Sequence, residues 1–142
     1  EAFPGMLPDR ILCHYTEHDQ LLGEEIKADF PALNYGKGYD NCFMINDYEA
    51  GQLQTAAQLY SPESGRQLEV LTTQPAVQIY TGNWLEGCPA GKSGRGYHDY
   101  EGVAIECQHC PDSPNKPEFP TTVLRPGETF SEAIIWAFSV RK

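Results

Sequence analysis

The chain has 142 residues, which is enough for one domain with a buried core, and its apolar and aromatic content is that of an ordinary globular protein. Its 20 acidic residues outnumber its 10 basic ones, which argues against nucleic acid or an anionic membrane as partner, because phosphate binding needs concentrated Lys and Arg. No apolar stretch is long enough to cross a bilayer and no basic-then-apolar leader is visible, so we expect no membrane association and no targeting signal.

Turn residues divide the chain into short β-branched or aromatic runs, a pattern that predicts an all-β, antiparallel architecture. In chain order, the expected elements are one candidate helix at Tyr15–Ile26 and strands at Asn41–Ile45, Leu53–Leu59, Leu68–Thr73, Ala76–Tyr80, Gly102–Gln108, Thr121–Leu124 and Glu132–Val140. The second and third strands form the clearest hairpin, because the connection between them ends in Gly65, which tolerates positive φ. In the last strand, large apolar residues alternate with smaller ones and predict one buried face: Ile134, Trp136, Phe138 and Val140.

Glu106 stands in the middle of the apolar run Gly102–Gln108, which is an unusual place for a charge. With the two-residue period of a strand, Glu106 points away from Ile105 and Cys107. A solvated outer face would explain this placement, and so would a carboxylate that lines a pocket.

Cys107 and Cys110 have the spacing of half a zinc site or of a dithiol redox pair. No second Cys pair follows, and a strand followed by a proline-rich loop is not the βαβ setting of a redox pair. The segment Gly87–Ser93 resembles a phosphate loop but has three residues between its glycines where four are required, so we expect an ordinary loop. We therefore predict no metal site and no phosphate loop.

The five cysteines are an odd number, and several lie in apolar contexts where free thiols behave as small hydrophobes. A reducing compartment, the cytoplasm, is the expected location. Because the chain opens at Glu1 without an initiator Met, we also expect that something upstream was removed or not included, and that segment could hold a leader.

Four residues together have the composition of a sugar-binding site: Asp40, Gln78, Trp84 and Glu106. Carboxylates accept hydrogen bonds from neighbouring hydroxyls, an amide both donates and accepts, and an aromatic ring packs on the C–H face of a pyranose. Each residue also has a simpler interpretation, such as Asp40 as a turn residue and Trp84 as part of the core.

Three segments that contain these residues occur in a fixed order: Gly38–Asn41, Gln74–Leu85, and Gly102–Gln108 continuing through Pro111–Pro120 to Glu128. In this order they resemble the C-terminal half of the galactose mutarotase (aldose 1-epimerase) family. The first is similar to the family's Gly-Tyr/Phe-Asp-His-Asn segment and the second to its Pro-Gly-x-Gln-Phe-Tyr-Thr-Gly-Asn segment. The resemblance runs from about Phe30 to the end, and residues 1–29 match poorly.

The resemblance implies that residues 1–142 form a single domain, part of the family's large β-sandwich, and that the enzyme interconverts the α and β anomers of an aldohexose such as galactose or glucose. Glu106 matches the family's general base, while Asp40 and Gln78 match residues that bind the sugar. Trp84 joins them as the expected aromatic contact. Ring opening by proton transfer requires no cofactor.

The chain also departs from the family pattern. Asn41 and Cys42 replace the usual His and Asn, and the family's general-acid histidine lies in an N-terminal half that this chain does not match. We therefore expect an N-terminal half of the same fold as partner. One alternative is a non-catalytic carbohydrate-binding or structural β-domain. Another is a phosphorylated-hexose epimerase, which would need clustered arginines, whereas Arg66, Arg95 and Arg125 are scattered.

Overall fold

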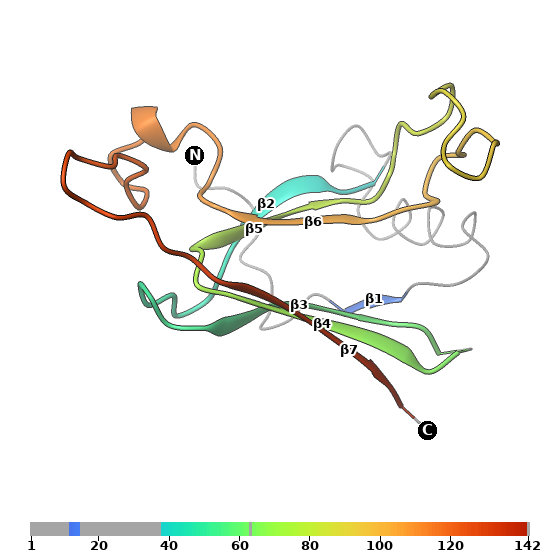
Figure 1. The fold of residues 1–142 in the computed structure, drawn as a ribbon, viewed down its shortest axis with the longest axis horizontal. Helices are drawn as coiled ribbons and strands as arrows, with labels where there is room; N and C mark the ends of the chain where they lie inside the picture. The colour runs from blue at the N-terminus through green and yellow to red at the C-terminus, as the bar shows by residue number, and fades with distance from the viewer. Residues whose placement is uncertain (1–11, 15–37, 63, 142) are drawn as a thin grey trace.

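The structure is a computed structural model that describes residues 12–14, 38–62 and 64–141. It contains two β-sheets that lie as two layers (Figure 1). The first sheet has the order β1-β3-β4-β7 and the second the order β2-β5-β6. Their bounds are β1 Leu12–His14, β2 Asp40–Met44, β3 Gln54–Tyr60, β4 Arg66–Thr72, β5 Ala76–Tyr80, β6 Ala104–Gln108 and β7 Ile134–Val140. Neighbouring strands are antiparallel except β1 and β3, which are parallel.

The predicted antiparallel β-sandwich is confirmed, and the expected strands are present with one exception. No strand forms at Thr121–Leu124. There the backbone N–H of Val123 donates to the hydroxyl of Thr121 at 3.2 Å, and the whole segment is exposed, so no burial favours a strand. The expected helix at Tyr15–Ile26 lies outside the described residues. No helix in the described ranges is long and apolar enough to cross a bilayer.

The β3–β4 hairpin closes as its sequence predicts. The N–H of Gly65 donates to the carbonyl of Ser61 at 2.8 Å, and the N–H of Ser61 donates to the carbonyl of Arg66 at 2.9 Å. Gly65 has φ 69°, in the left-handed region that favours glycine. This hairpin fixes the register of the four-stranded sheet.

The core lies between the two layers and is built by alternation along the strands. The second sheet contributes Phe43, Val77, Ile79 and Ile105, and the first contributes Ala57 and Val70. In the central strand β5, Val77 and Ile79 are buried, so Gln78 and Tyr80 lie on the opposite face. Burial of alternate residues thus gives the second sheet a polar outer face.

The expected burial of one face of β7 is wrong. Trp136 lies directly opposite Val70, and the other large residues of the row share this inward face. Nevertheless, the exposed fractions of these side chains range from 47% to 76%: Ile134, Trp136, Phe138 and Val140. The reason is positional, because β7 is an edge strand and the facing sheet has three strands in the described part of the chain. The alternation predicted the shared face but could not predict what covers it.

We expect Ile79→Ala to lower the free energy of unfolding by about 2–5 kcal/mol, because this side chain is fully buried between the layers and its loss leaves a cavity. Urea unfolding followed by far-ultraviolet circular dichroism measures the change. Val123→Ala, at an exposed position, is the matched control and should stay within about 0.5 kcal/mol of the parent chain. Equal effects of the two substitutions would contradict the described core.

Candidate functional site

Strand register brings three predicted site residues together on the outer face of the second sheet. Gln78 of β5 lies directly opposite Glu106 of β6 and, on its other side, directly opposite Cys42 of β2. Asp40 is two residues before Cys42 and therefore shares its face. The amide of Gln78 donates from Nε2 to Oδ1 of Asp40 at 2.9 Å. Residues from three distant segments thus form one polar row.

Glu106 is exposed, and its neighbours along β6 explain why. Ile105 faces the core and is 8% exposed, so the pleat directs Glu106 outward, beside Gln78. Residues directly opposite on antiparallel strands have Cβ atoms about 4.5–5.5 Å apart. A small molecule on this face would therefore meet both side chains.

The two ends of the Gln78 amide differ in their partners. Its Nε2 is bound to Asp40, whereas its Oε1 is buried and accepts no hydrogen bond within the described structure. A buried acceptor without a donor costs about 1–3 kcal/mol. A donor group from outside the described residues would remove that cost.

Trp84 follows β5 and is 58% exposed, so the interpretation of Trp84 as a core residue is wrong. Its backbone N–H donates to the phenolic oxygen of Tyr80 at 2.9 Å. Tyr80 lies directly opposite Asp40 in the register of β2 and β5. The hydrogen bond therefore ties the Trp84 backbone to the end of the polar row that holds Asp40. Asp40 itself begins β2 and is not a turn residue.

Two buried polar residues that sequence reasoning missed lie next to this row. Thr81 and Asn83 are 1% and 0% exposed and bind the backbone of Tyr39, the residue before Asp40. Their only signal in the sequence was the Thr-Gly-Asn turn, where such residues are ordinarily solvated. Their burial, which the sequence does not reveal, distinguishes them from ordinary solvated turn residues.

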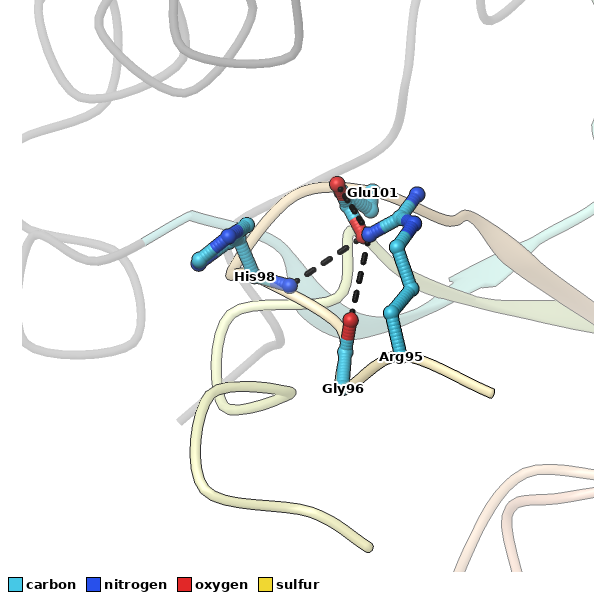
Figure 2. A network of polar contacts seen from close by, with 4 residues as sticks. All are labelled: Arg95, Gly96, His98 and Glu101. Carbon is cyan, nitrogen blue, oxygen red and sulfur yellow. Dashed lines mark hydrogen bonds and ion pairs between the residues drawn. The ribbon is translucent and has the colours of Figure 1, made fainter. Parts of the chain in front are cut away.

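The long connection between β5 and β6 is closed by an ion pair. Figure 2 shows Nη1 of Arg95 between the carboxylate of Glu101, at 2.7 and 2.9 Å, and the carbonyl of Gly96, at 3.1 Å. The backbone N–H of His98 donates to the same carboxylate at 3.2 Å. The hydrogen bond from Arg95 holds the pKa of Glu101 below its usual range. These contacts stabilise the conformation of the loop and engage the guanidinium group of Arg95.

The thiols near the site are poor nucleophiles. Burial raises the pKa of Cys42 to about 12, and the neighbouring Cys110, with which it shares a hydrogen bond, adds to the rise. Burial also raises the pKa of Cys107. Within the described ranges, no three His, Cys, Asp or Glu side chains are grouped so as to hold a metal ion. Cys107 and Cys110 are both free cysteines in this structure.

Comparison with known proteins gives the family. The family model described as aldose 1-epimerase matches residues 7–136. The chain belongs to the aldose 1-epimerase family. Asp40, Gln78 and Glu106 all lie within the matched residues.

Several relatives show how much of the family's length this chain covers. It is 44% identical over 103 residues to galactose mutarotase from Rattus norvegicus, covering 72% of this chain and 30% of the relative. It is 41% identical over 121 residues to aldose 1-epimerase from Escherichia coli, covering 84% and 34%. A solved aldose epimerase homologue from C. elegans superposes with a TM-score of 0.62 at 29% identity, covering 73% and 30%. The chain spans about a third of the length of these relatives.

The thiol chemistry can be tested by alkylation. A thiol with a pKa of about 12 is about 0.01% thiolate at pH 8, against roughly a quarter for an ordinary thiol. We therefore expect iodoacetamide to modify Cys42 about 10³-fold more slowly than the exposed Cys88, with the Cys42 rate rising about tenfold per pH unit below its pKa. Peptide mapping by mass spectrometry measures both rates, and equal rates in the folded chain would contradict the assignment.

Proposed function

We propose that this chain is the base-bearing C-terminal portion of an aldose 1-epimerase, which interconverts the α and β anomers of an aldohexose such as galactose or glucose. The observation that carries the proposal is the polar row. Asp40, Gln78 and Glu106 meet on one face of a three-stranded sheet, although they lie far apart in the sequence. Membership of the family supplies the chemistry that such a row would perform.

Glu106 is proposed as the general base. Its carboxylate takes the proton from the C1 hydroxyl while an acid protonates the ring oxygen, so that the bond between C1 and the ring oxygen breaks and a free aldehyde forms. Rotation about the C1–C2 bond followed by reclosure gives the other anomer. An exposed carboxylate beside an amide suits this role, because the sugar can reach it without a rearrangement of the sheet.

Three side chains are proposed to hold the sugar. Asp40 accepts hydrogen bonds from neighbouring hydroxyls, and Gln78 bridges Asp40 and the substrate. The hydrogen bond from Gln78 to Asp40 supports this role, because it fixes the amide beside an exposed carboxylate. Trp84, which is exposed at the same end of the sheet as Asp40, offers its ring to the C–H face of the pyranose.

The acid is proposed to come from an N-terminal portion of the same fold. The exposed apolar row on β7 supports this partner, because contiguous apolar patches usually mark interaction surfaces. A cavity of about 350 Å³ opens beside the row, with Leu59, Leu68 and Phe138 among the residues that line it. These residues face the space between the layers, where further strands of the second sheet would cover them.

Exposure of Glu106 also favours a second candidate, a non-catalytic carbohydrate-binding β-domain. Such a domain would bind a sugar through Asp40, Gln78 and Trp84 but lack the acid. A phosphorylated-hexose epimerase has less support, because Arg95 is engaged by Glu101 and Arg66 lies in the other sheet.

Polarimetry of freshly dissolved α-galactose tests the enzyme proposal. We expect this chain, mixed with the N-terminal portion of a family member, to speed mutarotation, and Glu106→Gln to lower the rate by about 10²–10⁴-fold because the base is lost. Glu49→Gln, an exposed carboxylate between β2 and β3, is the matched control and should leave the rate unchanged.

Two results would separate the candidates. Acceleration that survives Glu106→Gln rejects the base assignment. Galactose binding without any acceleration, even in the mixture, supports the non-catalytic domain and rejects the enzyme.

Tryptophan fluorescence tests the proposed partner surface. The chain has two tryptophans, so Trp84→Phe leaves Trp136 as the sole reporter. We expect its emission to shift to shorter wavelength when the N-terminal portion is added, because an indole that is 47% exposed would become buried. Adding Phe138→Glu to that variant should abolish the shift, since it puts a charge on the same apolar row. An unchanged spectrum at saturating partner concentration would refute this surface.

A further inference from the structure

We infer that Thr81 and Asn83 are positioning residues, which fix Asp40 and Trp84 relative to each other on the sugar-facing side of the second sheet and thereby set substrate affinity. The inference rests on the proposed function for the identity of the substrate. Its structural basis is a set of hydrogen bonds around the turn that follows β5.

The first half of this set holds the backbone just before Asp40. The N–H of Tyr39 donates to the hydroxyl oxygen of Thr81 at 3.0 Å. The carbonyl of Tyr39 accepts from the Asn83 side chain at 2.7 Å and from the Thr81 backbone at 3.2 Å. Both polar groups of the Tyr39 backbone are therefore bound by the turn, so the direction in which the chain enters Asp40 is fixed.

The hydroxyl proton of Thr81 has two acceptors within reach, and distance decides between them. Oδ1 of Asn83 lies at 2.5 Å and the carbonyl of Tyr39 at 3.4 Å. A single proton therefore goes to Asn83, which orients the Asn83 amide so that its Nδ2 faces Tyr39. Thr81 and Asn83 act as one unit, and burial protects that unit from competing water.

Gly38 shows how closely the backbone approaches this unit. Its φ is 125°, and a Cβ at this position would lie against the Asn83 amide and 2.8 Å from the Thr81 hydroxyl. No other residue fits without moving the pair. The segment before Asp40 is thus packed on the two side chains as well as bonded to them.

The second half of the set holds Trp84. Its N–H donates to the hydroxyl of Tyr80 at 2.9 Å, and the carbonyl of Gly82 accepts from the N–H of Tyr100 at 2.9 Å. A Cβ at Gly82 would lie 2.7 Å from the carbonyl oxygen of Gly102, so the turn is also packed against the backbone just before β6. Asn83 and Trp84 are adjacent in this turn. The Asn83 side chain binds the carbonyl of Tyr39, next to Asp40, and the Trp84 side chain is exposed.

A single turn therefore fixes the two backbone positions from which the Asp40 carboxylate and the Trp84 ring project. A pyranose presents both kinds of group at fixed separation, so a change in the turn weakens binding. Glu106 lies on β6 and shares no hydrogen bond with Thr81 or Asn83 within the described structure, so the proton transfer step should be unaffected. Such a change raises KM and leaves kcat in place.

The test uses the mixture of this chain with the N-terminal portion, at a temperature where every variant is folded. Thr81→Val keeps the shape of the side chain and removes the hydroxyl, and we expect it to raise KM for galactose about tenfold with kcat within about twofold. Thr81→Ser, which keeps the hydroxyl, is the matched control and should restore KM. A fall in kcat with unchanged KM would overturn the inference.

A double-mutant cycle separates positioning from a general loss of stability. If Thr81 acts through Asp40, Thr81→Val should have no further effect on KM in a chain that already carries Asp40→Ala. If the fold change in KM of the double variant equals the product of the two single fold changes, Thr81 acts independently of Asp40 and the inference fails.

Hydrogen exchange of this chain alone keeps the inference testable if the enzyme proposal fails. Absence of mutarotation in the parent mixture would reject the enzyme and leave the positioning to be decided by the Tyr39 amide. We expect Thr81→Val to speed exchange of that amide at least tenfold, because its acceptor is removed, while the amide of Phe43, in the strand β2 that follows Tyr39, keeps its rate. Unchanged exchange at Tyr39 would overturn the inference.

Discussion

The register of the central strand β5 is the constraint on which the rest of the structure depends. Val77 and Ile79 are buried between the layers, so a shift of one residue would place Gln78 in the core and both apolar side chains in solvent. The energy that prevents this shift is hydrophobic. The same energy places Gln78 between Cys42 and Glu106, and so the polar row derives its geometry from the opposite face of the sheet.

The buried polar groups beside that row depend on one another in a different way. Thr81 and Asn83 lie out of contact with water, where an unpaired donor or acceptor is costly. Their bonds to each other and to the Tyr39 backbone offset this cost only while the turn keeps its shape. A fully bonded network of this kind tolerates little displacement. The network of Thr81, Asn83 and the Tyr39 backbone therefore makes the exposed site near Asp40 as rigid as a buried one.

Much of the fold could be predicted from local sequence, and its failures have physical causes. Alternation and turn residues located the strands, because each signal lies within a few neighbouring residues. Thr121–Leu124 has the composition of a strand, but strand formation needs a partner and burial that composition does not report. The row of Asp40, Gln78 and Glu106 depends on the strand order β2-β5-β6, which joins segments that are not consecutive. Thr81 and Asn83 looked like turn residues because only packing reveals their burial.

The pairing of β4 with β7 has a consequence for the order in which the chain folds. Residues 66–72 pair with residues 134–140, so one edge of β4 stays open until the last strand has been synthesised. The β3–β4 hairpin is local and can form early, whereas closing this sheet requires a contact across more than 60 residues. During that interval the β4 edge presents free backbone donors and acceptors to other nascent chains. The β4 edge is therefore open to such contacts until β7 pairs with it.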